Sequence, residues 1–322
     1  MSAFLLRRLA ASLLLLLLVL SITFLLLHLV PGDPARIQES DRMTAEQREN
    51  LRRVLGLDRP LHEQYFSWLS GAVLRGDLGT SFSQQRPVTE AIKNALPGTL
   101  LLAFAALFVE FGAALLLGVA AARRPGTAVD HSIRIGTLLL FSQPVFWLGL
   151  MAILLFSYVW PVLPAGHRRS VGAGEMGAGE RLFDLLRHLL LPALVLGLTN
   201  AGATARFVRG SLLEVLSRDY IRTARAKGLS ERRVVWVHGM RNALPPLVQL
   251  LALTLPALLN GSLVTEVVFS WPGLGRLTFG AILARDFPLI LGTVAVSAIL
   301  VISGNLAADV LHALSDPRVR DA

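Results

Sequence analysis

Long, uninterrupted apolar runs constrain this chain more than any other feature of its sequence. Six candidate spans lie at 9–30, 97–122, 133–158, 187–208, 245–268 and 287–311. Each is close to the roughly 20 residues that a helix needs to cross the hydrocarbon core of a bilayer. The runs are apolar on all sides, so they need lipid or other helices around them. The sequence therefore predicts an all-α integral membrane protein with six transmembrane helices.

Composition excludes several other classes of protein. The chain is 53% hydrophobic and only 16% charged, which argues against a soluble domain of this size. The net charge of +9 belongs to loops between lipid-length runs, so we expect no nucleic-acid partner. Cysteine is absent, which excludes disulfides and cysteine-ligated metals. The first run lacks a small-residue cleavage site before Pro31 and is interpreted as an uncleaved helix.

Basic residues predict the orientation, because they are retained on the cytoplasmic side during insertion. With the N-terminus inside, the N-terminal end, the inner loops and the C-terminal tail together hold sixteen Lys and Arg, and the two short outer loops hold six. Both termini are therefore predicted to be cytoplasmic. The resulting parts are an N-terminal transmembrane helix at 1–30, an extracytoplasmic helical segment at 31–93, a transmembrane domain at 94–312 with a cytoplasmic loop at 206–243, and a cytoplasmic tail at 313–322.

The outer segment after the first span is expected to be helical. Thr44 and Gln47 form a capping box that would open an amphipathic helix, and Asp58 can cap a second helix through Tyr65 and Trp68.

The cytoplasmic loop contains the most unusual stretch, "SRDYIRTARAKGLSERR" at 217–233. It predicts a helix, a turn at Gly228 and a second helix capped by Ser230. Ala224, Ala226 and Gly228 are small and would let another protein approach closely. Two interpretations stay open: the bend docks in a groove of a protein partner, or its arginines bind anionic lipid headgroups.

Several motifs resemble one family in the same order along nearly the whole chain. They are "LVPGDP" at 29–34, "GLDRPLHEQYFSWL" at 56–69, "GDLGTS" at 76–81, "FWLG" at 146–149, "ARAKGLSERR" at 224–233, "RNALPP" at 241–246, "EVVFSWPGLGRL" at 266–277 and "DPRVR" at 316–320. The set is similar to the permeases of ABC importers, in the dipeptide, oligopeptide and nickel branch, and "ARAKGLSERR" resembles their EAA loop. The first residues depart from the EAA consensus, because Arg222 stands at the glutamate and Thr223 at the first alanine.

The resemblance implies a type I ABC importer permease fold in the bacterial inner membrane. The EAA-like residues would form a helix that couples to a cytoplasmic ATPase. They are Thr223, Ala224, Arg225, Ala226, Lys227, Gly228, Leu229 and Ser230. Implied partners are two ATPase subunits, a second homologous permease or another copy of this chain, and an extracytoplasmic solute-binding protein. Because the chain has no G-x-x-x-x-G-K-[ST] loop, ATP and Mg would be bound by the ATPases, and no catalytic residue, cofactor or metal is expected here.

Three further residues are candidates for the pathway or a gate. Glu110 lies within the second span, where a carboxylate usually faces a cavity or a partner, although a structural role is also open. Glu266 begins an outer turn that contains Trp271. The family resemblance implies a gate or receptor contact there, and an interfacial aromatic anchor is the alternative. The expected cargo is a di- or oligopeptide. Alternatives are nickel or another small solute, or an ion-coupled secondary transporter.

Overall fold

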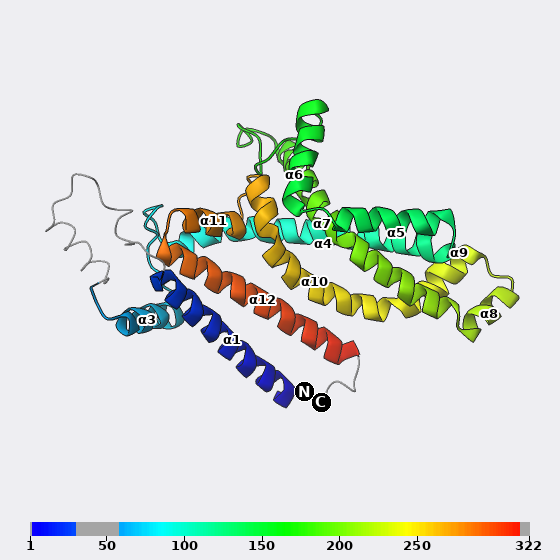
Figure 1. The fold of residues 1–322 in the computed structure, drawn as a ribbon, viewed down its shortest axis with the longest axis horizontal. Coiled ribbons are helices and arrows are strands. Elements are labelled where there is room, and N and C mark those ends of the chain that lie inside the picture. Colours follow the sequence, from blue (N-terminus) through cyan, green and yellow to red (C-terminus); the bar gives the residue numbers. More distant parts are fainter. Residues whose placement is uncertain (1, 30–57, 316–322) are drawn as a thin grey trace. The chain divides into compact units, whose positions relative to one another are not determined.

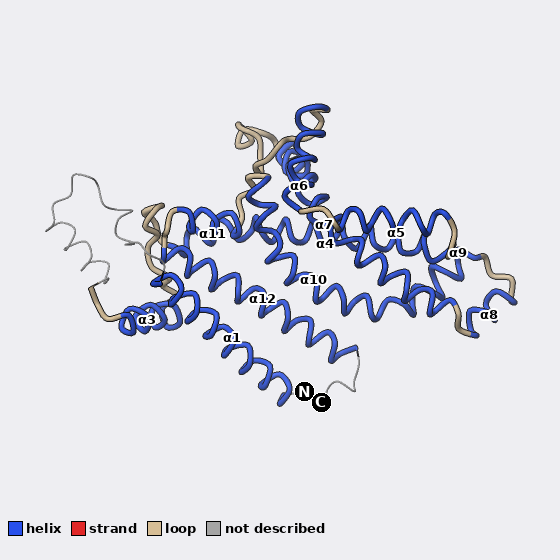
Figure 2. Tube along the Cα trace, in the orientation of Figure 1, coloured by secondary structure: helices blue, strands red, loops and turns tan. Residues whose placement is uncertain are grey.

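The described part of the chain is built from helices. The computed structural model describes residues 2–29 and 58–315, and within them one isolated bridge, between Thr80 and Pro87, is the only extended pairing. Figures 1 and 2 show the helices and the loops that join them. The chain divides into two compact units, with unit 1 comprising Met1–Thr99 and Pro272–Ile302 and unit 2 comprising Leu100–Trp271 and Ser303–Ala322. The prediction of a helical chain is confirmed.

Five stretches of helix are long and apolar enough to cross a membrane. Four of them are Leu6–Leu29 in α1 (Ser2–Leu29), Val88–Arg123 forming α4, Ala178–Leu216 forming α7, and Phe287–Val310 in α12 (Phe287–Ser315). The fifth, Glu231–Leu259, runs through three consecutive elements. These are α9 (Glu231–Arg233), η4 (Val234–Gly239) and much of α10 (Met240–Val268). Each of the five stretches corresponds to a predicted span, and several extend beyond the predicted boundaries.

The remaining predicted span, at 133–158, is wrong as one continuous helix. α5 (Ala128–Phe141) is followed by α6 (Val145–Ile153) and η3 (Leu154–Val159), and the two parts are bent by 98°. Pro144 has no N–H to donate and holds the residue before it away from helical conformation, so the helix stops and restarts. A sixth span exists only if this bent pair is counted as one.

The expected outer helices are partly described. The one opened by Thr44 and Gln47 lies outside the described residues. The second is present as α3 (Leu61–Ser70), continued by η2 (Gly71–Arg75), but the capping by Asp58 is wrong. Its N-cap residue is Pro60, whose carbonyl accepts the first hydrogen bonds, because the chain stays extended through Pro60 before the helix begins. Tyr65 joins α3 to α1 through a 2.7 Å hydrogen bond between its hydroxyl and that of Ser21.

Unit 1 is held together around the start of α12. Asp286 is fully buried and accepts hydrogen bonds from the Ser81 hydroxyl at 2.5 Å, from the Ser83 hydroxyl and N–H at 2.7 and 2.8 Å, and from the Leu289 N–H at 3.2 Å. The last of these caps α12. Beside it, α4, α11 (Leu274–Leu283) and α12 share an apolar core. The carboxylate therefore fixes the turn before α4 to the beginning of α12.

Unit 2 is centred on α7, which packs against α4, α5, α6 and α10. Two glycines allow α4 and α7 to approach closely. A Cβ at Gly118 would lie 2.7 Å from the Val208 Cβ, and a Cβ at Gly197 would lie 2.6 Å from the Ala106 carbonyl oxygen. Small residues at such crossings let backbones meet where the hydrophobic effect between helices is weak. This tightly packed group of helices carries the charged loop that the sequence singled out.

Candidate coupling site

The candidate site is the bend between α7 and α10, which we call the coupling bend (residues 219–233). α8 (Asp219–Ala226) ends at Lys227, and Gly228 follows in the left-handed region with φ of 77°. The Gly228 N–H donates to the Arg225 carbonyl at 2.9 Å, and the Leu229 N–H donates to the Ala224 carbonyl at 3.4 Å. These two bonds form a Schellman motif, which satisfies carbonyls left free at the helix end. The predicted turn at Gly228 is confirmed.

The second half of the coupling bend begins as expected, although its cap differs. Ser230 is the N-cap of α9 and has extended backbone angles, but its side chain makes no capping hydrogen bond. Instead, the first-turn residue Glu231 pairs with Arg225 across the turn, with an Nη2 to Oε1 distance of 2.8 Å and an Nε to Oε2 distance of 3.2 Å. α9 then passes through η4 into α10 without a break in the helical path.

The Arg225–Glu231 pair sets the distance between the two halves of the coupling bend but contributes little to its stability. The hydrogen bonds that the Arg225 guanidinium donates to the Glu231 carboxylate raise the pKa of the guanidinium above its ordinary value. The two side chains are 43% and 50% exposed, so water screens most of the attraction, and an exposed pair of this kind contributes about 0.2–1 kcal/mol. What the pair provides is a fixed distance between α8 and α9.

Most of the predicted coupling residues are on the surface. Exposed among them are Thr223, Arg225, Ala226, Lys227, Gly228 and Ser230, whereas Leu229 is half-buried. Ala224 is the exception, with 7% of its surface exposed, so its expected role in letting a partner approach is wrong in this conformation. It packs against Ile221 and Val234 inside the bend, where a larger side chain would push α8 from η4. Its small size serves the fold of the loop itself.

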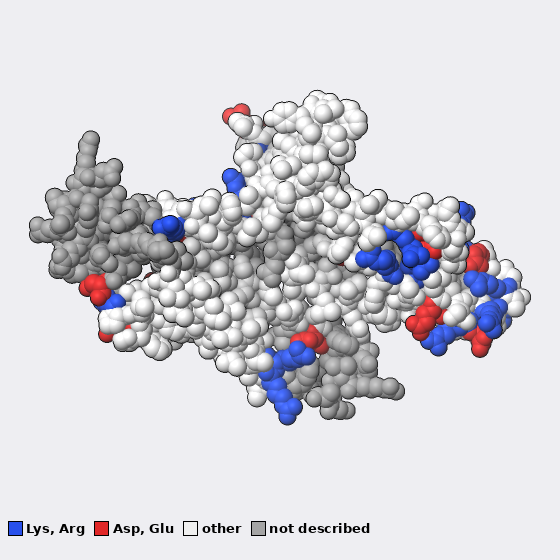
Figure 3. All heavy atoms as spheres, in the orientation of Figure 1, with Lys and Arg blue, Asp and Glu red and all other residues white. Residues whose placement is uncertain are grey.

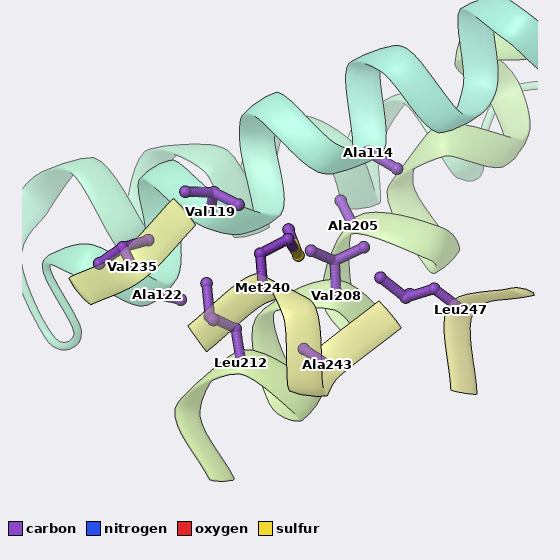
Figure 4. Close-up of a cluster of buried hydrophobic side chains, with 10 residues drawn as sticks. All are labelled: Ala114, Val119, Ala122, Ala205, Val208, Leu212, Val235, Met240, Ala243 and Leu247. Atoms are coloured by element: carbon purple, nitrogen blue, oxygen red, sulfur yellow. The ribbon is translucent and has the colours of Figure 1, made fainter. Parts of the chain in front are cut away.

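An apolar core of unit 2 lies beside the coupling bend, and Leu216 packs against both this core and the Ile221–Ala224–Val234 cluster of the bend. Figure 4 shows side chains of α4, α7, η4 and α10 converging in this core of unit 2. The members are Ala114, Val119 and Ala122 from α4, Ala205, Val208 and Leu212 from α7, Val235 from η4, and Met240, Ala243 and Leu247 from α10. Val208, Leu212 and Val235 are completely buried. The coupling bend is therefore in packing contact with these helix ends, and well-packed interiors have low compressibility.

Charge is concentrated on the coupling bend. Figure 3 shows basic and acidic side chains gathered over α8 and α9, while the apolar helix surfaces carry few. Arg222 pairs with Asp219 at 3.3 Å and Arg225 with Glu231, but Lys227, Arg232 and Arg233 form no ion pair with any described residue. The surface thus presents net positive charge on a rigid turn. It can attract an acidic protein surface or anionic headgroups, so charge alone leaves both interpretations open.

Glu110 does not face an open cavity in this conformation. It is 1% exposed and lies between α4 and α7, where its Oε1 accepts a 2.6 Å hydrogen bond from the Thr204 hydroxyl. Its Oε2 has no hydrogen-bond partner among the described residues. This position fits the structural alternative raised for Glu110, and a role in the pathway would require α4 and α7 to separate.

Glu266 and Trp271 are both fully buried. Glu266 Oε1 accepts a hydrogen bond from the Ser262 hydroxyl at 3.0 Å, and its carbonyl accepts the Trp271 N–H at 2.8 Å. The Trp271 ring packs in an apolar core with Leu102 and Leu258. The Trp271 ring is therefore not on the surface in this conformation, and receptor contact and interfacial anchoring remain predictions. The gate remains a prediction.

Two polar clusters were missed from the sequence. The first joins Asp130 of α5 to Arg209 of α7 in a buried two-pronged ion pair. The second lies at the opposite end of α7, where Asp184 accepts the Ser170 hydroxyl at 2.6 Å and His188 lies 3.2 Å from the same hydroxyl. Arg209 is distant in sequence from Asp130, as Ser170 is from Asp184, and a single Asp in the first turn of a helix, as at Asp130, is typical of dipole stabilisation. Within the described residues, no His, Asp and Glu cluster could hold a metal ion.

The helices are long enough to cross a bilayer, and two of them are joined by an exposed, charged bend that is held by an internal ion pair. These features define the class as a polytopic membrane protein with a structured charged loop. The chain belongs to the family of binding-protein-dependent transport system inner membrane components, whose model matches residues 114–321, and the N-terminal model of the same family matches residues 1–103. It is thus an inner-membrane permease of ABC importer type, as the sequence motifs indicated.

Curated relatives cover nearly the whole chain. The oligopeptide transport system permease protein AppB of Bacillus subtilis (strain 168) is 37% identical over 320 residues, covering 99% of both chains. The probable D,D-dipeptide transport system permease protein DdpB of Escherichia coli (strain K12) is 41% identical over 312 residues, covering 92% of both chains. The dipeptide transport system permease protein DppB of Escherichia coli (strain K12) is 37% identical over 337 residues, covering 99% of both chains.

A solved structure supports the fold. A chain from the inward-facing MetNI methionine ABC transporter matches with a TM-score of 0.53 and 22% identity, covering 68% of this chain and 94% of that chain. At this identity the likeness concerns the fold alone. The predicted type I importer permease fold is confirmed.

Proposed function

We propose that this chain is the membrane translocation subunit of an ATP-driven importer for di- or oligopeptides. The observation that carries the proposal is the coupling bend, which is exposed and positively charged on one side and continuous with the buried core of unit 2 on the other. A cytoplasmic ATPase that binds such a bend can displace α4, α7 and α10 together. Relatives named as oligopeptide and dipeptide permeases support the cargo class.

The partners in this proposal are two cytoplasmic ATPases, a second homologous permease or another copy of this chain, and an extracytoplasmic binding protein that delivers peptide. ATP and Mg are bound and hydrolysed by the ATPases. Nucleotide binds more tightly to one arrangement of the ATPase pair, and this differential affinity shifts the permease between inward-facing and outward-facing packings. Residues Thr223 to Ser230 form the contact with the ATPase, with Ala224 acting by packing from within.

The proposed topology places both termini and the loop at 206–243 in the cytoplasm. The segment at 31–93 then lies outside with the loop before α7, and the transmembrane domain covers 94–312. Glu110, Glu266 and Trp271 are proposed to change their surroundings when the packing changes, with Trp271 closing the outer end in the present conformation.

The test uses the chain co-expressed with the genes beside it. Wild type should co-purify an ATPase and, in proteoliposomes with the binding protein, take up radiolabelled di-alanine and tri-alanine when ATP is present. Gly228→Trp should abolish uptake, since an L residue disfavours φ of 77° and the large ring occupies the docking surface. Gly172→Trp is the matched control, because Gly172 also has positive φ, at 83°, and open space around it, but lies in another loop.

Absence of any co-purified ATPase, together with normal uptake by Gly228→Trp, would show that the proposal is wrong. Uptake driven by a proton or sodium gradient without ATP would favour a secondary transporter instead.

A further inference from the structure

Asp130 and Arg209 form a two-pronged ion pair between α5 and α7, with its carboxylate side buried. The Arg209 Nε donates to Asp130 Oδ1 at 2.8 Å and its Nη2 donates to Oδ2 at 2.7 Å, so both carboxylate oxygens are engaged. The side chain of Asp130 is 1% exposed and that of Arg209 is 23% exposed. Two parallel hydrogen bonds of this kind fix orientation as well as distance. Because the carboxylate of this pair is buried, removing Arg209 would leave a buried charge without its partner, which is costly.

Asp130 also holds the turn that leads into α5. The Gly126 N–H donates to Asp130 Oδ2 at 3.0 Å, so one carboxylate binds the α4–α5 turn and α7 at once. Ala122, just before this turn, packs in the same apolar core as Leu212 of α7 and Val235 of η4. The ion pair therefore lies at the junction of α4, α5 and the helix that leads directly into the coupling bend.

α5 makes its connection to the coupling bend through α7. The core that joins α4, α7, η4 and α10 contains no residue of α5. Farther along α5, its backbone meets α7 closely, since a Cβ at Gly202 would lie 2.8 Å from the Thr137 carbonyl oxygen. Near the start of α5, the two hydrogen bonds of the ion pair set the register between the two helices.

The other end of α5 leads toward the buried turn that contains Trp271. α6 follows α5 after the bend at Pro144, and a Cβ at Gly149 of α6 would lie 3.0 Å from a Val268 methyl and 3.3 Å from the Phe269 ring. Val268 ends α10, immediately before the turn that leads to Trp271. A displacement of α5 along α7 would thus reach the segment proposed as a gate.

We propose that the Asp130–Arg209 ion pair is a positioning element that makes α5 and α6 follow the coupling bend, so that ATP hydrolysis is converted into movement at the gate. The inference rests on the proposed function as an ATP-driven permease. Neither residue touches the cargo. Their action is indirect. When α7 is displaced, Arg209 moves with it, and the ion pair displaces Asp130 together with α5 and the α4–α5 turn.

The experiment measures peptide transported per ATP hydrolysed, with wild type and variant complexes in proteoliposomes and radiolabelled di-alanine as the probe. Asp130→Asn and Arg209→Gln should retain the ATPase subunits and hydrolyse ATP, while the transport ratio falls about tenfold or more, since one unpaired partner is left buried. Glu214→Gln is the matched control. It removes the Arg218–Glu214 pair of the same helix, whose side chains are 61% and 68% exposed, and should leave the ratio unchanged.

A second variant separates positioning from folding. The chain has no cysteine, so Asp130→Cys/Arg209→Cys introduces the only two thiols. With free thiols, this double variant should show the low ratio. A short bis-thiol-reactive cross-linker, which ties α5 to α7 again, should restore it.

Three outcomes would overturn the inference. One is a ratio in Asp130→Asn and Arg209→Gln equal to that of Glu214→Gln. Another is a cross-linked double variant in which the amount of peptide transported per ATP hydrolysed stays low. That result would mean that α5 and α7 must separate during transport, or that the pair does not act by holding them together. The third is failure of the single variants and the double variant to accumulate in the membrane, which would place the pair in folding alone. If wild type itself co-purifies no ATPase, it is the proposed function that fails.

Discussion

At Gly228 the backbone, rather than the surrounding space, determines which residue is tolerated. A Cβ there would meet nothing within 4 Å, yet φ of 77° disfavours every other common residue. The sequence was sufficient to predict this bend because helix-ending signals are local. The same stretch did not predict that Ala224 faces inward, since its burial depends on Val234, which lies beyond the turn. Exposure of a small residue in a loop is set by how the loop folds back, and spacing alone does not determine it.

Glu110 and Thr204 provide a prediction at the same scale. Thr204→Val should lower the free energy of unfolding by about 1–3 kcal/mol, because it leaves the buried Glu110 carboxyl without its donor. Thermal unfolding of the purified protein in detergent would measure the change. Thr199→Val is the matched control: Thr199 is on the same helix, is 7% exposed and bonds only the Val195 carbonyl one turn back.

Replacing both partners should be milder than replacing one. Glu110→Met combined with Thr204→Val removes the buried polar groups together, so this double variant should unfold closer to wild type than Thr204→Val does. Equal stability of Thr204→Val and Thr199→Val would contradict the structural role assigned to Glu110.

At the scale of elements, the lengths of the apolar runs correctly predicted where most helices lie, but they did not predict which helix is bent. The spans in α1, α4, α7, α10 and α12 follow from apolar runs alone. The break between α5 and α6 was signalled by Pro144, but α10 contains Pro245, Pro246 and Pro256 within one continuous helix. A proline in a membrane helix can kink it, break it or be absorbed, and neighbouring helices decide which. Those neighbours are not visible in a local pattern.

Helix crossings follow from the same small residues and can be tested at Gly197. Gly197→Ala should destabilise unit 2 by about 1–3 kcal/mol, because its Cβ would lie 2.6 Å from the Ala106 carbonyl oxygen and α4 and α7 would have to move apart. The midpoint of thermal unfolding in detergent reports the effect. Gly112→Ala on α4 is the control, since a Cβ there meets nothing, and it should be neutral or stabilising. If both variants unfold alike, close packing at Gly197 is not what holds this crossing.

At the scale of the whole molecule, the family and the orientation depend on different information. Motifs spread from "LVPGDP" to "DPRVR" were enough to indicate the permease family, because no single motif had to be decisive. The side of the membrane on which each loop lies depends on insertion, and it was predicted from arginine placement. The buried ion pair and the buried Trp271 were beyond sequence reasoning, because they depend on which helix faces meet.

Orientation can be tested with single cysteines, since the native chain has none. Val171→Cys, at a fully exposed position in the loop before α7, should react with a membrane-impermeant thiol reagent in intact cells or in spheroplasts. Ala226→Cys, exposed in the coupling bend, should react only after the membrane is permeabilised. Labelling of both positions after permeabilisation is the control for reactivity. The reverse pattern would invert the predicted topology.

The 98° bend between α5 and α6 has a consequence for what must surround it. Where a helix is interrupted, carbonyl groups near the break lose their regular donors, and hydrocarbon supplies none. Phe141, Phe146 and Trp147 flank the break with about half of their surface exposed. The side chains around the break are therefore apolar, whereas the backbone groups at the break are polar. Such a corner is stable beside another protein chain or beside water, but not against acyl tails. We therefore expect this corner to lie beside another protein chain or beside water when the protein is in a membrane.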